Sequence, residues 1–206
     1  MRIDMVRTAG VFELDGDTFE VEDNIWLVGE DDEILVVDAA HESAPIVDAI
    51  GGRRVAAIVC THGHNDHINA AVELADKTGA EIALHPADRM LWDAVHPQRA
   101  PDRELSDGDV LKVAGGQLSV IHTPGHTPGG VCLYTGAGHV FVGDTLFKGG
   151  PGATGRKYSD FPTIIRSIEA RLLTLPSDTV VHPGHGDTTT IGDEAPHLGE
   201  WIERGN

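Results

Sequence analysis

The stretch THGHNDH, residues 61–67, decides how the rest of this sequence is read. It places three histidines and one aspartate within six positions, directly after the apolar run VAAIVC at residues 55–60. That run has the length and apolar continuity of a strand that is buried on both faces. A loop at the end of such a strand can aim polar side chains in fixed directions. We therefore expect these side chains to bind metal.

Spacing within the motif separates its polar side chains into two pairs. Residues two apart in an extended segment point the same way, so His62 and His64 can face one ion together. Asp66 and His67 follow where the chain is expected to enter a helix, and they project from a different turn. Gly63 lets the backbone pass close to the ions without a clashing side chain. A second metal position beside the first is therefore geometrically natural.

Three further segments place candidate ligands in loops that follow predicted strands. They are TPGHTPGG at residues 123–130, GDTLF at 143–147 and PGHGD at 183–187, which contain His126, Asp144 and His185. Imidazole binds Zn(II), Fe(II) or Mn(II), and carboxylate adds a hard anionic ligand. A catalytic zinc ion takes about four ligands, one of them water. Seven candidates therefore suit two ions that share a bridging carboxylate and a bridging hydroxide.

Short β-branched and aromatic runs separated by turns indicate strands over much of the chain. The predicted strands lie at residues 11–14, 18–21, 24–29, 34–39, 55–61, 80–85, 109–113, 117–123, 130–135, 139–147 and from residue 179. Helical spacing or capping predicts one helix that begins near Ser43 and others within 69–79, 160–176 and 193–206. Residues 87–105 are expected to form a helix and then a loop. Hairpins mixed with strand-helix units predict an α/β fold of two sheets with helices outside. With no repeat or linker, we expect one domain over residues 1–206.

Composition narrows the function classes. The formal charge of -18 disfavours nucleic acid as a partner, because such binding relies on lysine and arginine at phosphates. No window approaches the roughly 18 consecutive apolar residues of a membrane span, and the N-terminus lacks the apolar stretch of a secretory signal. We therefore predict a cytoplasmic protein without a membrane partner. Cys60 and Cys132 lie in apolar strand-like runs, which indicates buried free thiols.

In this order, THGHNDH, TPGHTPG, GDTLF and PGHGD resemble the metallo-β-lactamase superfamily, with its HxHxDH motif and αββα sandwich. The match extends over nearly the whole chain. GDTLF, GGPGATGR at residues 149–156 and PGHG are most similar to the glyoxalase II (hydroxyacylglutathione hydrolase) branch, in a short form without an added substrate domain.

The resemblance implies a role for each candidate ligand. His62, His64 and His126 would hold metal one, and Asp66, His67 and His185 metal two, with Asp144 bridging. We expect two divalent ions, Zn(II) first, with Fe or Mn as alternatives. The residues predicted to act in catalysis are Asp66, His62, His64, His67 and Asp144. In the β-lactamases a cysteine stands at the position of Asp144, which argues against antibiotic hydrolysis.

The other histidines and one acid carry weaker signals. His85, His96, His139 and His197 are predicted to be surface or satisfied core residues, whereas His122, His182 and His41 lie near ligand loops or the cleft. His122 and His182 either orient a ligand side chain or have no role at the site. Asp38 resembles the family's acid that steadies a ligand histidine, or is a simple strand-end acid.

A cationic cluster in this acidic chain predicts where a carboxylate-bearing substrate docks. It consists of Lys148, Arg156 and Lys157, with Tyr158 beside them. The resemblance implies the same, because family enzymes hold the glutathione moiety near this segment. The alternative is that these are exposed loop charges.

Thioester hydrolysis is the leading functional hypothesis, with a small-molecule thiol conjugate as substrate and a metal-bridging hydroxide as nucleophile. A thiolate leaving group, with a pKa near ~8.5, needs little protonation. The main alternative is a persulfide dioxygenase, an iron oxidoreductase whose family has the same fold but uses one iron ion. A non-catalytic metal-binding module and an RNA-processing nuclease are more remote. The sequence leaves open whether the chain is a monomer or a homodimer.

Overall fold

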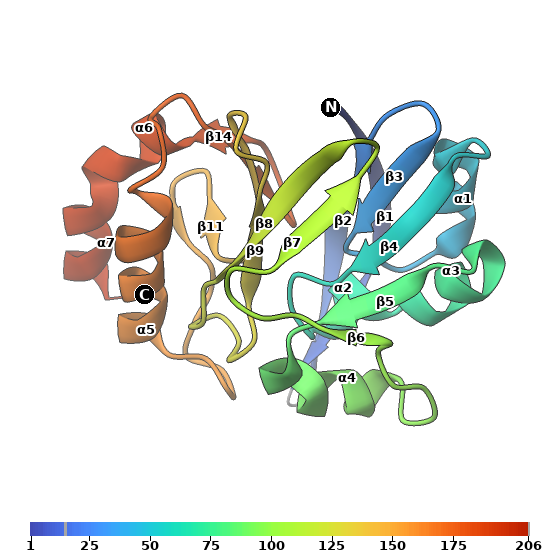
Figure 1. The fold of residues 1–206 in the computed structure, drawn as a ribbon. Helices are drawn as coiled ribbons and strands as arrows, with labels where there is room; N and C mark the ends of the chain where they lie inside the picture. The colour runs from blue at the N-terminus through green and yellow to red at the C-terminus, as the bar shows by residue number, and fades with distance from the viewer. Residues whose placement is uncertain (15, 206) are drawn as a thin grey trace.

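Two six-stranded sheets pack face to face and carry helices on their outer surfaces (Figure 1). This computed structural model describes residues 1–14 and 16–205. The arrangement is the αββα sandwich that the sequence predicted, and the prediction is confirmed.

The first sheet has the strand order β1-β2-β3-β4-β5-β6. Its strands are β1 (Arg2–Leu14), β2 (Asp17–Gly29), β3 (Glu33–Val37), β4 (Arg54–Val59), β5 (Glu81–Leu84) and β6 (Arg103–Glu104). The first three strands are antiparallel, and β3 to β6 run parallel. The helices of this half are α1 (Ser43–Ile50), α2 (Asn65–Ile68), α3 (Ala71–Thr78), the 3-10 turn η1 (Pro86–Asp88) and α4 (Arg89–Val95).

The second sheet has the order β14-β13-β10-β9-β8-β7. Its strands are β7 (Val110–Val113), β8 (Gly116–His122), β9 (Val131–Tyr134), β10 (His139–Gly143), β13 (Val180–Pro183) and β14 (Thr189–Thr190). A small hairpin joins β11 (Leu146–Phe147) to β12 (Gly150–Pro151). The helical segments are α5 (Phe161–Ser167), the π-helical η2 (Ile168–Leu172), α6 (Ile191–Glu194), the 3-10 turn η3 (Ala195–His197) and α7 (Leu198–Arg204).

Strand β4 shows why the inner strands are apolar on both faces. Successive side chains of a strand point to opposite faces. Ile58 packs outward into the core under the helices of the first sheet, whereas Val59 packs inward into the core between the sheets. A third core lies under the helices of the second sheet and includes Leu172 and Trp201. Apolar layers on both sides of each sheet hold the strand ends, and the loops they carry, in fixed positions.

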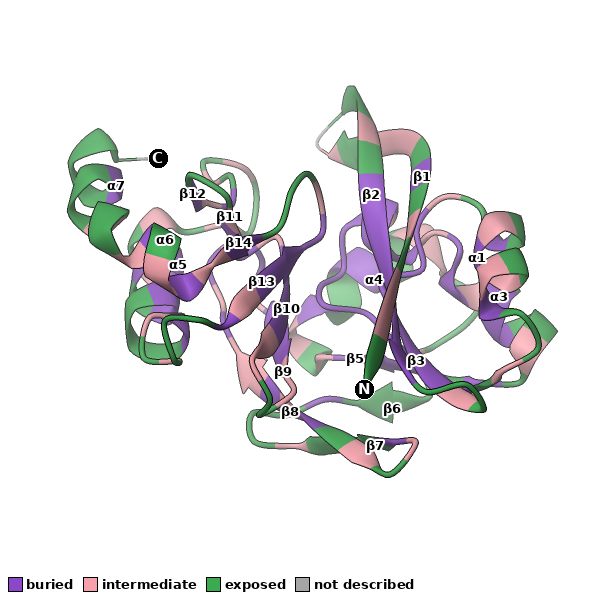
Figure 2. Ribbon diagram, turned by 90° about the horizontal axis from the view of Figure 1, so that it is seen from above, coloured by how far each residue is buried: buried purple, intermediate pink, exposed green. Residues whose placement is uncertain are grey.

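The first two strands differ from the prediction. The short runs expected at 18–21 and 24–29 form one continuous strand, β2, which pairs along its whole length with the equally continuous β1. The acids between the two runs do not break the strand, because the ladder with β1 keeps their backbone groups paired. Figure 2 shows the exposed end of this hairpin projecting beyond the other strands of the sheet.

Several predicted elements are interrupted where the chain meets the site. The expected strand 139–147 splits because Gly143 has a left-handed φ of 48°, which turns Asp144 out of the ladder. The expected helix 69–79 begins later, as α3, after the separate turn of α2. The helix predicted at 160–176 continues as a π-helical turn, and that at 193–206 consists of α6, η3 and α7.

Both cysteines are buried and free, as predicted. Burial raises the pKa of Cys132 to about 11 and that of Cys60 well above its ordinary value, so both thiols stay protonated at neutral pH. In the part of the chain that the structure describes, no helix has both the length and the apolar character needed to cross a membrane.

Candidate metal centre

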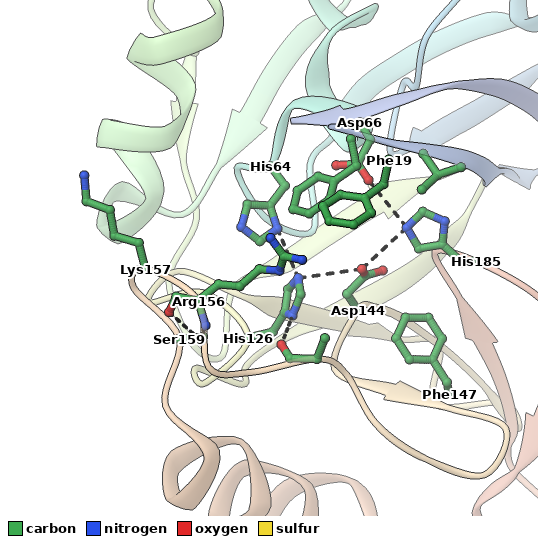
Figure 3. A pocket seen from close by; sticks show the side chains of 13 residues that line it. Phe19, His64, Asp66, His126, Asp144, Phe147, Arg156, Lys157, Ser159 and His185 are labelled. Carbon is green, nitrogen blue, oxygen red and sulfur yellow. Dashed lines mark hydrogen bonds and ion pairs between the residues drawn. The ribbon is translucent and has the colours of Figure 1, made fainter. Parts of the chain in front are cut away.

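All seven candidate ligands meet in one cluster, at the end where four loops converge. The loops follow β4, β8, β10 and β13, and the cluster forms the floor of a cavity (Figure 3). Strands from both sheets thus contribute, so the sandwich itself sets the distances between the ligands.

His62, His64 and His126 form the first group of the cluster. Nε2 of His62 lies 3.1 Å from Nδ1 of His64, and Nε2 of His126 lies 3.0 Å from the same atom. Nitrogens bound tetrahedrally to one zinc ion, at about 2.0–2.1 Å, lie about 3.3 Å from each other. The three nitrogens therefore face a common point at close to the separation that one ion requires.

His67, His185, Asp66 and Asp23 form the second group. The Nε2 atoms of His67 and His185 are 3.2 Å apart, and His185 Nε2 lies 3.6 Å from Oδ2 of Asp66. Oδ1 of Asp23 lies 3.5 Å from His185 Nε2 and 3.7 Å from His67 Nε2. The second group is thus richer in carboxylate than the first.

Asp144 lies between the two groups, as the dashed lines in Figure 3 show. Its Oδ1 is 3.4 Å from His67 Nε2, and its Oδ2 is 3.5 Å from His185 Nε2. The same Oδ2 is 3.6 Å from Nε2 of His126, which belongs to the first group. The Asp144 carboxylate is therefore placed where ions held by the two groups could share it.

The ring nitrogen that points away from the cluster has a partner in four of the five histidines. His62 Nδ1 contacts Thr61 Oγ1 at 3.2 Å, and His67 Nδ1 contacts Oδ2 of Asp38 at 3.1 Å. In the other two, Nδ1 contacts the backbone carbonyl of Ala153 or Glu22: His126 at 2.9 Å and His185 at 2.8 Å. Such contacts are typical of histidines that bind metal, because they fix the orientation of the ring. Asp38 thus steadies a candidate ligand.

Four buried polar atoms of the cluster have no hydrogen-bond partner among the described residues. They are Oδ1 of Asp23, Asp66 and Asp144, and Nε2 of His64. Buried polar atoms are rarely left without a partner, because desolvation makes this costly. A pair of divalent cations would satisfy the three carboxylate oxygens, so the residues present fit such ions. Nε2 of His64 is on the side of the ring away from the other ligands, because Nδ1 faces them.

Electrostatics differ between the two groups. Burial, reinforced by neighbouring histidines, lowers the pKa of His62 and His64 well below the ordinary value, and burial also lowers that of His126. These rings are neutral at pH 7 and can offer a lone pair. Burial raises the pKa of Asp66 to about 6.

The second group attracts positive charge. Burial alone would lower the pKa of His185 and His67, but the nearby carboxylates, Asp144 foremost, together outweigh it. They raise the pKa of His185 to about 9 and that of His67 well above its usual value. Reciprocally, these rings hold the pKa of Asp144 well below its ordinary range despite burial. A position that stabilises cationic imidazole so strongly also favours a metal cation.

Residues 20–185 match the family model described as the metallo-beta-lactamase superfamily. The chain belongs to this superfamily. The motifs and the fold had indicated the same family, so the resemblance is confirmed.

Within the superfamily, one similar protein is "Hydroxyacylglutathione hydrolase GloC" of Haemophilus influenzae. It is 33% identical over 189 residues, which cover 83% of this chain and 89% of the relative. A solved structure titled "TTHA1623 in a di-iron-bound form" is 32% identical, with a TM-score of 0.76, and the match covers 85% of this chain and 93% of that one. The "BLEG-1 B3 metallo-beta-lactamase" is 27% identical, with a TM-score of 0.79 and coverage of 93% and 98%.

The cavity above the superfamily's motif residues has a volume of about 350 Å³. Apolar side chains form much of its wall: Phe12, Phe19 and Val21 from the β1–β2 hairpin, and Phe147 and Ala153 from the segment after Asp144. The guanidinium of Arg156 lies 4.6 Å from the ring centroid of Phe19 and 3.5 Å from a carboxylate oxygen of Asp17. The hairpin tip and the segment carrying Arg156 are thereby tied together over the floor.

The structure brings two of the four predicted substrate-binding residues to this cavity. Arg156 and Lys157 line it, although in Figure 3 the Lys157 side chain extends away from the histidines. Tyr158 is 41% exposed, carries the ammonium of Lys157 4.8 Å from its ring, and is not part of the lining. Lys148 lies in a separate groove with its ammonium 3.9 Å from Asp187. Tyr158 and Lys148 thus lie outside the lining of this cavity, and their role in substrate binding stays a prediction.

Sequence reasoning missed two buried aspartates. Asp23 belongs to the second group, and Asp88 accepts hydrogen bonds from the backbone on both sides of the first group. Asp23 stands among exposed acids of a hairpin strand, and Asp88 stands in a helical turn far from any motif. The only available signal for Asp23 was that it directly precedes the apolar run NIWLVG, where β2 joins the core.

The remaining histidines lie apart from the cluster, with one exception. His139 and His182 contact each other at 3.0 Å, and His122 stacks on His85, so neither His122 nor His182 contacts a candidate ligand. His41 contacts Asp23 and is the exception. His96 and His197 have other partners: His96 contacts the Ile68 carbonyl, and His197 is exposed beside Glu200.

Proposed function

We propose that this protein is a metal-dependent hydrolase that cleaves the thioester of a low-molecular-weight thiol conjugate. The observation that carries the proposal is the pair of facing ligand groups, joined by Asp144, on the floor of a cavity with an apolar wall and one guanidinium. The similarity to the hydroxyacylglutathione hydrolase of Haemophilus influenzae supports it.

The chain's own residues supply the positions that such a reaction needs. His62, His64 and His126 would hold one ion, and Asp66, His67 and His185 the other, with Asp144 shared. When bound, divalent ions lower the pKa of water to about 7 and polarise a carbonyl group. Among the lining side chains of the described residues, Lys157 and Ser159 are the other potential nucleophiles. The hydroxyl of Ser159 donates to the Arg156 carbonyl at 2.7 Å. A thiolate leaving group suits this floor because it needs no general acid.

Substrate selection would come from the wall. Phe12, Phe19 and Phe147 offer apolar surface to one part of the substrate, and Arg156 offers a charge to a carboxylate. Small-molecule sites commonly combine an apolar lining with a few fixed polar groups. A thiol conjugate that carries a carboxylate, as glutathione does, matches this combination.

Hydrolysis of a β-lactam is the second candidate. The similarity to the B3 metallo-β-lactamase BLEG-1, at 27% identity over 93% of this chain, favours it. The aspartate at position 144 was expected to disfavour antibiotic hydrolysis, and the similarity to BLEG-1 counts against that expectation. The chemistry differs in the leaving group, which is a poor one in an amide and a good one in a thioester.

A substrate panel on metal-loaded protein tests the proposal. Acyl conjugates of glutathione, mycothiol and bacillithiol would be assayed for release of free thiol, beside a chromogenic β-lactam. We expect thioester turnover, at least about 100-fold lower in Asp144→Asn, because even the loss of an outer partner of a ligand costs 10–100-fold. Asp187→Asn, an exposed acid of the neighbouring loop, is the matched control and should stay within about twofold.

Three outcomes would overturn the proposal. The first is the absence of free thiol from every conjugate. The second is β-lactam turnover that exceeds thioester turnover. The third is a protein that contains one iron per chain and consumes oxygen with a persulfide, which would indicate a dioxygenase. Metal analysis per chain separates the last outcome from the others.

A further inference from the structure

Asp23 is buried to 1% exposure, and its two carboxylate oxygens have different surroundings. Oδ2 contacts Nε2 of His41 at 2.5 Å. Oδ1 has no hydrogen-bond partner and lies 3.5 Å from His185 Nε2 and 3.7 Å from His67 Nε2. Oδ2 is therefore held by His41, which lies outside the cluster, while Oδ1 faces the histidines of the second group.

The contact with His41 is itself supported by neighbours. The side-chain amide nitrogen of Asn69 donates to Nδ1 of His41 at 3.2 Å, so Nε2 carries the proton and donates to Asp23. The backbone N–H of His41 donates to Oδ1 of Asn69, and His41 has a left-handed φ of 57°. A side chain at position 10 would overlap the His41 ring, so the glycine at this position leaves room for the ring. Three residues, His41, Asn69 and Gly10, thus cooperate to orient one carboxylate.

We propose that Asp23 is a further ligand of the second metal position and makes that position selective for a harder ion than the first. With Asp23, the second group offers two imidazoles, two carboxylates and the shared Asp144, whereas the first offers three imidazoles and Asp144. Zinc sites usually have four ligands, and oxygen-rich sites of higher coordination number suit Mn(II). The second position therefore discriminates less strongly against Mn(II) than the first.

Metal binding by the whole chain tests this inference without any substrate. Metal-free protein, prepared by dialysis against a chelator, would be titrated with Mn(II), and free Mn(II) would be followed by electron paramagnetic resonance. Zn(II) affinity would be measured in parallel by competition with a chelating dye. With one equivalent of Zn(II) per chain and Mn(II) in excess, we expect the wild type to take one zinc and one manganese per chain.

The Asp23→Asn variant should bind Mn(II) at least about 100-fold more weakly, because it loses a ligand rather than only an outer partner, whose loss costs 10–100-fold. Zn(II) binding at the first group should change by less than about twofold, which also shows that the variant is folded. Glu22→Gln is the matched control, since Glu22 is the exposed neighbour on the same strand, and it should match the wild type.

A second variant keeps the inference falsifiable if Asp23→Asn does not fold. His41→Phe retains Asp23 and a ring of similar size but removes the donor to Oδ2, so Mn(II) affinity should fall on the order of tenfold. Unchanged Mn(II) affinity in either variant would overturn the inference, as would an equal loss of zinc and manganese. Because no substrate is used, thioester hydrolysis can hold or fail independently of this result.

Discussion

Asp88 shows how a single side chain can position a group of ligands that it does not touch. It is completely buried, and its Oδ2 accepts hydrogen bonds from the backbone N–H of Gly63 at 2.9 Å and from Oγ1 of Thr127 at 2.7 Å. Its Oδ1 accepts from the backbone N–H of Gly129 at 2.5 Å. Gly63 lies between His62 and His64, and Thr127 follows His126, so Asp88 joins the two loops of the first group.

Replacement of Asp88 by asparagine should weaken zinc binding at the first group by about 10–100-fold, the usual cost of losing an outer partner. The amide keeps the volume but turns one acceptor into a donor that faces donors. Competition with a chelating dye measures the change. Asp93→Asn, an exposed acid of α4, should leave the affinity unaltered. Equal weakening of both metal positions would instead indicate a general loss of structure.

His182, a buried histidine, makes the free energy of unfolding depend on pH. Burial, with a smaller contribution from His139, lowers the pKa of His182 to about 4 from an ordinary value near 6.5. The unfolded chain binds the proton more readily, so the stability contributed by the neutral ring is present above about pH 6.5. It is lost as the pH falls from about 6.5 to about 4, and amounts to no more than about 3 kcal/mol.

Denaturant unfolding of the metal-free protein between pH 4 and 7 checks this pH dependence. The free energy of unfolding of the wild type should fall more steeply towards low pH than that of His182→Gln, which has no proton to gain. The difference between the two proteins removes the contribution of other groups. His197→Gln, at an exposed histidine, should follow the wild type. Parallel curves for His182→Gln and the wild type would contradict the prediction.

At the scale of elements, the β1–β2 hairpin forms one wall of the cavity. Asn65 at the start of α2 holds the hairpin near its tip, since its side chain donates to the Val11 carbonyl at 2.7 Å and accepts from the backbone N–H of Glu13 at 2.8 Å. From the other side, Arg156 lies over the ring of Phe19. An element far from the histidines in sequence thereby controls access to them.

Truncation of Phe19 should change substrate binding more than chemistry. Phe19→Ala should raise KM for thioesters with a bulky apolar group by about tenfold, because about 1–2 kcal/mol of apolar contact is lost. Turnover of a small acetyl conjugate should change much less. Thr18→Ala, at the neighbouring exposed position of β2, is the control. An equal effect of Phe19→Ala on all conjugates would indicate that the ring does not contact the substrate.

For the whole molecule, the cluster concentrates buried carboxylates that metal cations would balance. The chain has a net charge of -18. Asp23, Asp38 and Asp66 are buried, and each has a carboxylate oxygen within 4 Å of a ring nitrogen of His67. Buried carboxylates are costly unless they are paired or bind a metal. Metal removal should therefore lower stability as well as activity.

Calorimetry with and without metal tests the coupling of binding to stability. At a free zinc concentration of 100 times Kd, each independent site should add about 2.7 kcal/mol to the free energy of unfolding. The stabilisation should be smaller in Asp144→Asn, because this residue is placed between both groups. A melting temperature that does not change on chelation would show that the cluster does not hold the ions in the folded protein.

The sequence indicated the superfamily, the two-sheet architecture and the pairing of His62 with His64, because these depend on local order and on apolar periodicity. The ends of elements near the site were harder to predict. Strand β2 continues through a run of acids because β1 pairs with it, and the strand expected at 139–147 breaks at Gly143, where the chain turns Asp144 towards the cluster.

Local sequence by itself therefore identified the seven candidate ligands that meet in the cluster, because the motif loops that contain them follow buried strands. Only the tertiary structure decided that Asp23 and Asp88 belong beside them, and that Lys148 and Tyr158 do not line the cavity. The reason is physical: burial and contact depend on which segments pack together. Asp23 lies close to His41 and His185, from which it is separated by 18 and 162 positions in the sequence. A local sequence pattern cannot predict contacts between residues so far apart in the chain.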